Sequence, residues 1–139
     1  MSETRRVRRV RVLLADNLTD HRVLLRLRLE ADGRFDVVAE ARHGAEAVEL
    51  AELHQPDVVV LDIAMPVMDG LEALRRIREN TPETKVVILS ALLADETAAK
   101  AYELGAYAYL QKSLAVQQIA TVLAPLSPIE FEDSEDPVP

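Results

Sequence analysis

The chain has 139 residues, of which 49% are hydrophobic and 29% charged, and its formal net charge is −8 at pH 7. This length fits one domain with a sizeable core, and the composition is globular rather than disordered or fibrous. Cysteine and tryptophan are absent, which excludes disulfides, thiolate metal sites and a cysteine nucleophile and disfavours stacking on single-stranded nucleic acid. Because no apolar stretch is long enough to cross a bilayer and no signal-peptide core is present, we expect a soluble, cytoplasmic protein with no membrane partner.

Five short apolar runs alternate with segments of helical periodicity. In chain order we expect a strand at 10–15, a helix at 19–30, a strand at 35–39, a helix at 45–53, a strand at 58–61, a helix at 71–79, a strand at 86–89, a helix at 95–104, a strand at 106–110 and a helix at 113–123. Strands that are continuously apolar are typical of a parallel sheet covered on both faces. With right-handed crossovers, this predicts a flavodoxin-like (βα)5 α/β fold, a doubly wound parallel sheet with strand order 2-1-3-4-5.

The two ends of the chain carry opposite charge. Residues 1–11 contain five arginines and one glutamate, whereas residues 127–139 contain five acids and no base. We expect both ends to be solvated, and the alternative for the arginines is a weak contact with nucleic acid or a partner. The acidic body argues against direct nucleic-acid binding by the domain itself. We divide the chain into a basic lead (1–8), a folded domain (9–124) and an acidic tail or start of an interdomain linker (125–139).

Polar side chains follow four of the five predicted strands. Asp16 and Asn17 follow the first, Asp62 the third, Ser90 the fourth, and Gln111 and Lys112 the fifth. In the predicted order these strands are neighbours, so their carboxyl ends bring the polar groups to one crevice, where open α/β sheets bind ligands. Taken singly, each residue has a plainer explanation as a turn, a helix cap or a surface group. Their joint placement favours a functional site.

Two carboxylates, an amide, a hydroxyl and an ammonium suit phosphoryl transfer to a carboxylate. A carboxylate can act as the nucleophile and form an aspartyl-phosphate, and oxygen ligands can hold Mg²⁺, which helps to neutralise the transferring group. Three histidines, His21, His43 and His54, have no metal-ligand spacing. We expect all three to be surface or partly buried residues outside this site.

Residues 56–70 read PDVVVLDIAMPVMDG and contain the motif D-x-x-M-P-x-x-D-G, which begins at Asp62. The segments VLLADN (12–17), KVVILSA (85–91) and GAYAYLQKS (105–113) accompany it in order. Over about residues 9–124, the chain resembles the receiver domain of two-component response regulators, and most closely that of the LuxR/NarL-type transcription regulators. The resemblance implies a signalling domain rather than an enzyme, with Mg²⁺-dependent self-phosphorylation and slow self-dephosphorylation.

The resemblance also implies a role for individual residues. Asp62 is the expected phosphoacceptor, Ser90 and Lys112 are expected to contact the phosphoryl group, and Ser90 with Tyr109 forms the expected switch. The expected Mg²⁺ ligands are Asp16, Asn17, Asp62 and the backbone carbonyl of Ala64. Apart from the resemblance, Tyr109 is more simply explained as cover for the edge of the fifth strand. The implied partners are a histidine kinase, a second copy in a homodimer and, if the chain is an excised receiver, a DNA-binding output domain that controls transcription.

One departure from the family pattern is Asn17, because receivers usually have two acids where this chain has Asp16 and Asn17. An amide ligates through its carbonyl oxygen without charge, so we expect weakened Mg²⁺ affinity. The alternative function is a degenerate receiver that acts as a protein-interaction module without phosphate. An aspartyl-phosphate hydrolase is disfavoured because Ala64 stands where a second acid is needed, and a nucleotide-binding domain because no glycine-rich loop follows the first strand. Whether the chain is an excised or a stand-alone receiver stays open.

Overall fold

The computed structural model describes residues 8–65, 68–91 and 95–127. The strands are β1 (Val10–Ala15), β2 (Phe35–Ala41), β3 (Val58–Asp62), β4 (Lys85–Ser90) and β5 (Ala108–Gln111). The helices are α1 (Thr19–Asp32), α2 (Gly44–His54), α3 (Gly70–Asn80), α4 (Asp95–Glu103) and α5 (Ala115–Leu123), with short 3-10 turns at η2 (Lys112–Leu114) and η3 (Ala124–Leu126). All paired strands are parallel and their order is β2-β1-β3-β4-β5, which confirms the predicted fold.

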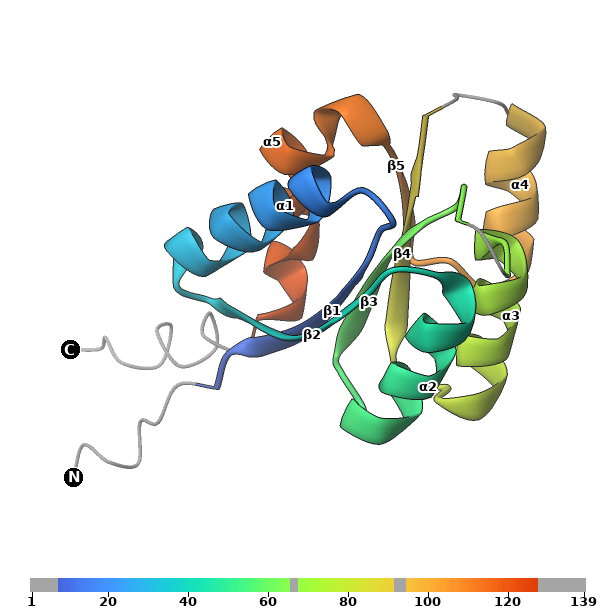
Figure 1. The fold of residues 1–139 in the computed structure, drawn as a ribbon, viewed down its shortest axis with the longest axis horizontal. Helices are drawn as coiled ribbons and strands as arrows, with labels where there is room; N and C mark the ends of the chain where they lie inside the picture. Colours follow the sequence, from blue (N-terminus) through green and yellow to red (C-terminus); the bar gives the residue numbers. More distant parts are fainter. Residues whose placement is uncertain (1–7, 66–67, 92–94, 128–139) are drawn as a thin grey trace, which may run out of the picture.

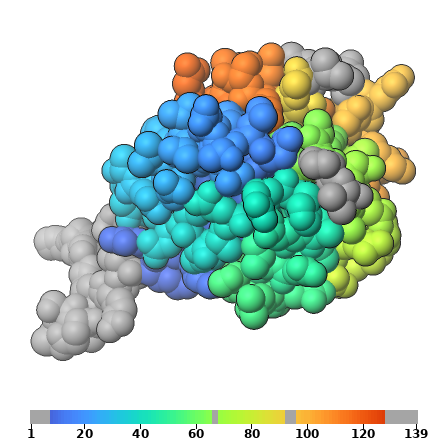
Figure 2. All heavy atoms as spheres, viewed as in Figure 1, coloured from blue at the N-terminus to red at the C-terminus, as the bar shows by residue number. Residues whose placement is uncertain are grey.

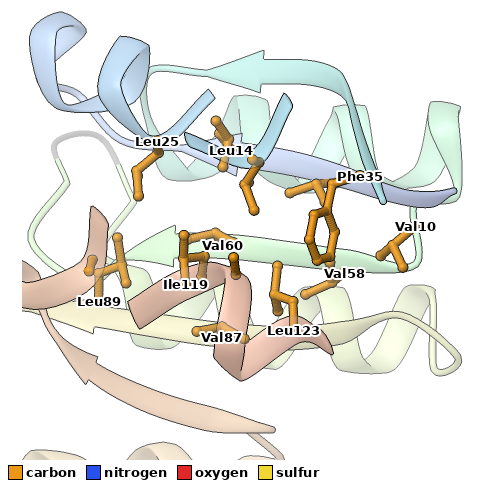
Figure 3. Packing of buried hydrophobic residues seen from close by; sticks show 14 residues of the cluster. Val10, Leu14, Leu25, Phe35, Val58, Val60, Val87, Leu89, Ile119 and Leu123 are labelled. Carbon is orange, nitrogen blue, oxygen red and sulfur yellow. The ribbon is translucent and has the colours of Figure 1, made fainter. Parts of the chain in front are cut away.

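The sheet lies between two layers of helices, with α1 and α5 on one face and α2, α3 and α4 on the other (Figure 1). Along β1, Val12 and Leu14 pack into one core cluster, whereas Leu13 and Ala15 pack into the other. Both faces of the central strands are therefore buried, which explains why their sequences are apolar without alternation. On the α1/α5 side, Leu25 and Ile119 come from the two helices to meet Val60 and other strand residues (Figure 3).

The last strand and helix begin later than the sequence predicts. Gly105 has a φ of +101°, and the Ala106 backbone N–H donates to the Ala101 carbonyl at 2.9 Å. This is the glycine-dependent cap that ends α4, so Ala106 belongs to the cap and β5 starts at Ala108 instead of residue 106. The final helix was expected from residue 113, but η2 intervenes and α5 starts at Ala115. The other expected elements are confirmed within two residues at each end.

Two arginines near the start of the described chain, Arg8 and Arg11, contact the folded domain. Arg8 pairs with Asp57 at 2.8 Å. The Arg11 guanidinium donates to the last carbonyls of α2, at 2.8 Å from His54 O and 2.9 Å from Gln55 O. Arg11 thus satisfies carbonyls that a helix end leaves without intrahelical partners. Arg8, the one residue of the basic lead that the structure describes, keeps 59% of its side chain exposed despite this ion pair, whereas residues 1–7 and 128–139 lie outside the described part of the chain.

Among the described residues, no helix is both long and apolar enough to span a bilayer. Figure 2 shows the blue surface of α1 beside the orange surface of the C-terminal segment, with α2 and β2 covering the adjoining part of this face. The residues predicted for the site lie at the carboxyl end of the sheet, where α1 and η2 begin.

Candidate functional site

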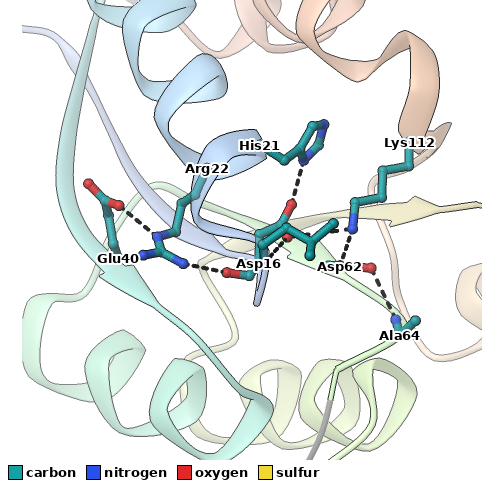
Figure 4. Close-up of polar contacts among 8 residues, drawn as sticks. Asp16, His21, Arg22, Glu40, Asp62, Ala64 and Lys112 are labelled. Carbon is teal, nitrogen blue, oxygen red and sulfur yellow. Dashed lines mark hydrogen bonds and ion pairs between the residues drawn. The ribbon is translucent and has the colours of Figure 1, made fainter.

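Two buried carboxylates share one ammonium at the carboxyl end of the sheet. Asp16 directly follows β1, Asp62 ends the neighbouring β3, and each is only 1% exposed. Lys112 begins η2 just after β5, and its Nζ lies 2.6 Å from Asp62 Oδ2 and 3.5 Å from Asp16 Oδ1 (Figure 4). The structure thus brings together three of the residues that the sequence selected from strands far apart in the chain.

Each carboxylate also accepts a backbone hydrogen bond from its own loop. Asp16 Oδ1 accepts from Leu18 N at 2.9 Å, and Asp62 Oδ1 accepts from Ala64 N at 3.1 Å. Both are turns of the Asx kind, in which an aspartate bonds the backbone two residues on. Both aspartates therefore have the role in a turn that an aspartate after a strand often has, and they are also part of the site. These bonds fix the direction of each carboxylate.

The other residues selected from the sequence lie on β4 and β5 or directly after β1. Ser90 ends β4, between the strands of Asp62 and Lys112, and is 3% exposed. Tyr109 pairs in register with Ile88, two residues before Ser90, and packs partly buried against the core beneath α3 and α4. Ser90 and Tyr109 therefore lie on the same face of the sheet. Asn17 is exposed beside Asp16, and Gln111 is partly buried opposite Ser90 in the β4–β5 register.

His21 corrects the expectation that no histidine belongs to the site. Its Nδ1 lies 2.5 Å from Asp16 Oδ2 (Figure 4). Because a carboxylate oxygen accepts, Nδ1 carries the hydrogen and donates. His21 lies in the first turn of α1, where side chains tilt back toward the helix N-terminus and so toward the end of β1. A histidine in the first turn after a strand-end aspartate was the sequence signal for this contact. His43, the N-cap of α2, and His54, the last residue of that helix, do not contact the two carboxylates.

Strand β2 also contributes, through an ion-pair chain behind Asp16. Arg22 donates to the Asp16 backbone carbonyl at 2.6 Å and to Glu40 Oε1 at 2.7 Å, and Arg26 donates to Glu40 Oε2 at 2.6 Å. Burial alone would raise the pKa of Glu40, but the hydrogen bonds from Arg22 and Arg26 outweigh it and hold that pKa below its usual value. The sequence analysis did not predict this network of ion pairs, which connects the backbone of Asp16 to the edge strand β2.

The donor set fits a hard divalent cation. Two carboxylates that are almost fully buried face a single ammonium, so a further positive charge would be stabilised there. Among the described residues, no group of three or more carboxylate and imidazole side chains is arranged as a metal cage. Mg²⁺ is the cation that suits one or two carboxylates with water and phosphate oxygens completing its shell. The Asp16 and Asp62 carboxylates are the oxygen donors that the structure brings together at this position.

The rest of the D-x-x-M-P-x-x-D-G motif positions the loop after Asp62. Asp69 is the N-cap of α3, and its side chain accepts from Glu72 N at 2.9 Å. Gly70 begins the helix so close to β3 that a Cβ at this position would overlap the Cα of Ile63. A glycine is therefore required for α3 to start against the end of β3. The motif thus connects the Asp62 carboxylate to a fixed helix start.

A family comparison agrees with this geometry. Residues 12–124 match the response regulator receiver domain. The chain belongs to that family. It is a receiver domain of two-component response regulators, a phosphoacceptor signalling domain, as the sequence motifs implied.

Individual relatives represent more than one kind of output protein. A protein-glutamate methylesterase/protein-glutamine glutaminase of Myxococcus xanthus is 47% identical over 107 residues, which cover 76% of this chain and 30% of the relative. The transcriptional regulatory protein LiaR of Bacillus subtilis is 35% identical over 114 residues, which cover 82% of this chain and 54% of LiaR. The solved receiver domain of a NarL response regulator from Mycobacterium tuberculosis has a TM-score of 0.80 and 32% identity, covering 85% of this chain and 95% of that one. The chain spans about a third to a half of the first curated relatives it matches.

Proposed function

We propose that Asp62 is the phosphoacceptor of this receiver and that a histidine kinase is the donor. The observation that carries the proposal is the buried Asp62 carboxylate held 2.6 Å from the Lys112 ammonium. One oxygen of Asp62 attacks the phosphorus of a phosphohistidine, a P–O bond forms, the P–N bond breaks, and the imidazole leaves with its electron pair. Lys112 lies where it can neutralise charge on the transferred group. Ser90 is the last residue of β4, the strand between β3 and β5, so its hydroxyl lies at the same end of the sheet.

The cation is proposed to bind through Asp16, Asp62, the Ala64 carbonyl and Asn17. When bound, Mg²⁺ offsets negative charge on the phosphoryl oxygens. Asn17 lacks the charge of the usual second acid, so we expect a cation affinity weaker than in receivers with two acids. The chain's own residues hold the nucleophile in direction through the Ala64 N–H and hold Asp16 through Leu18 and Arg22.

The output that this receiver controls is proposed to be a DNA-binding domain in a cytoplasmic transcription regulator, with homodimerisation as its switching step. The similarity to LiaR and to the NarL receiver supports this proposal. The 47% identity to a methylesterase/glutaminase supports a second candidate, in which the receiver controls an ester-hydrolysing domain. Phosphodonor-dependent DNA binding by the full-length protein supports the first candidate, and phosphodonor-dependent methyl-ester hydrolysis supports the second.

Incubation with acetyl phosphate and Mg²⁺ tests the proposed chemistry and separates it from the degenerate, phosphate-independent alternative. We expect intact-mass spectrometry to show one added phosphoryl group in the wild type and in Asp36→Asn, and none in Asp62→Asn. Asp36 is a suitable control because it is exposed on β2 and pairs only at the surface with Arg9. An unmodified wild type, or equal modification of Asp62→Asn, contradicts the proposal.

A further inference from the structure

The contact between His21 and Asp16 has a consequence for cation binding. Asp16 Oδ1 accepts from Leu18 N and lies 3.5 Å from Lys112, which leaves Oδ2 as the oxygen that these two groups do not contact. That oxygen is the one which His21 Nδ1 contacts at 2.5 Å. Mg²⁺ binds carboxylate oxygens at about 2.0–2.1 Å, which places it in the same shell as the imidazole donor. A positively polarised N–H directed at this oxygen repels a dication that approaches the same oxygen, so the two compete for it.

We propose that His21 is a built-in competitor of the divalent cation at Asp16. This inference rests on the proposed function, because it assumes that Asp16 is a cation ligand. In the cation-free protein the His21 donor satisfies the buried carboxylate, and the ring must leave Oδ2 when the cation binds. His21 is thus a positioning residue that lowers cation affinity, in addition to the missing charge at Asn17.

The surroundings of the ring favour displacement over shared ligation. Among the described residues, His21 Nε2 is the one buried side-chain nitrogen or oxygen that lacks a hydrogen-bond partner. Within the described part of the chain, the ring therefore makes one hydrogen bond, to Asp16, and no second partner holds the ring in place. A groove of about 430 Å³, lined by Leu18, Thr19, Asp20, His21 and Leu24, adjoins the ring and offers space into which it can turn.

Isothermal calorimetry of Mg²⁺ binding at constant pH tests the competition. His21→Leu removes the donor, whereas His21→Asn keeps an N–H at the δ position, and His54→Leu makes the same change on α2 at the opposite end of the sheet. We expect His21→Leu to bind Mg²⁺ about tenfold more tightly than wild type, the effect of removing one hydrogen bond to a charged group. We expect His21→Asn and His54→Leu to bind like wild type. In an Asp16→Asn background, His21→Leu should give no such gain.

An unchanged or weaker affinity in folded His21→Leu overturns the inference, and a weaker one would make His21 a ligand instead. Should that variant not fold, nitrogen-15 resonances of the wild-type ring decide the matter. We expect saturating Mg²⁺ to abolish the signature of the hydrogen-bonded Nδ1–H, and an unaltered ring signal under saturation overturns the proposal. Acetyl phosphate labelling of Asp62 is measured in parallel. Normal labelling with unchanged affinity in His21→Leu defeats only the competition, whereas absent Mg²⁺ binding together with absent labelling defeats the proposed function as well.

Discussion

Lys112 Nζ lies 2.6 Å from Asp62 Oδ2, although the two residues are 50 positions apart in the chain and β4 separates their strands. The same ammonium lies 3.5 Å from Asp16 Oδ1, so it is shared by two buried carboxylates. The arrangement leaves an excess of negative charge at the carboxyl end of the sheet. That excess makes the site suitable for a cation, and a bound cation would in turn offset the negative charge of an incoming phosphoryl group.

The shared ammonium predicts an asymmetry in stability. Lys112→Met removes the ammonium that the two buried carboxylates share, and we expect the free energy of unfolding to fall by about 2 kcal/mol. Asp62→Asn leaves one carboxylate with one ammonium, so we expect a much smaller change. Urea unfolding measures both, with Lys100→Met as the control because Lys100 is exposed and only loosely paired with Glu103 at 3.7 Å. Equal effects of Lys112→Met and Lys100→Met would contradict this account of the site.

Restoring the second acid should strengthen cation binding. Asn17→Asp adds a negative charge beside Asp16, and we expect Mg²⁺ affinity to rise on the order of tenfold and labelling by acetyl phosphate to become faster. The matched control is Asn80→Asp, which adds the same charge at the exposed end of α3. Calorimetry that finds the same affinity in Asn17→Asp and wild type would show that residue 17 is not a cation ligand.

Gly70 allows α3 to start directly against Ile63, the residue that follows Asp62. In Gly70→Ala the new methyl group would overlap the Ile63 backbone, so we expect a loss of about 2 kcal/mol in the free energy of unfolding together with slower labelling of Asp62. Gly33→Ala is the contrast. Gly33 has a φ of +88° and open space around its Cβ position, so alanine should cost about 1 kcal/mol through backbone strain and leave labelling unchanged. Normal labelling in a folded Gly70→Ala variant would disprove the link.

Ser90 and Tyr109 lie on the same face of the sheet, so a movement of one side chain can change the space open to the other. We expect beryllofluoride with Mg²⁺ to shift the protein toward a dimer in analytical ultracentrifugation, because a phosphoryl-like group draws in Ser90 and lets Tyr109 turn inward. Ser90→Ala should abolish the shift, whereas Ser113→Ala, an exposed serine in η2, should retain it. Proven beryllofluoride binding without any change in sedimentation would remove self-association from the mechanism.

The parts of this molecule that follow local rules could be predicted from its sequence. Continuous apolar runs indicated the parallel sheet, and the strand-end positions of Asp16, Asp62 and Lys112 indicated that they meet. His21 and the Arg22–Glu40 pair were missed because their contacts depend on how α1 lies over the end of β1, which periodicity does not specify. The start of β5 was misplaced because Gly105 caps α4 and draws Ala106 into the cap.

The measurement that tests the central claim most directly is the location of the phosphoryl group within the labelled protein. After reaction with acetyl phosphate and Mg²⁺, the acyl phosphate is reduced with borohydride, which converts the modified aspartate to homoserine, and the peptides are sequenced by mass spectrometry. Our account predicts homoserine at residue 62 and at no other aspartate. Homoserine at Asp16 or Asp69 with Asp62 intact, or no homoserine at all, would contradict the assignment of Asp62 as the phosphoacceptor.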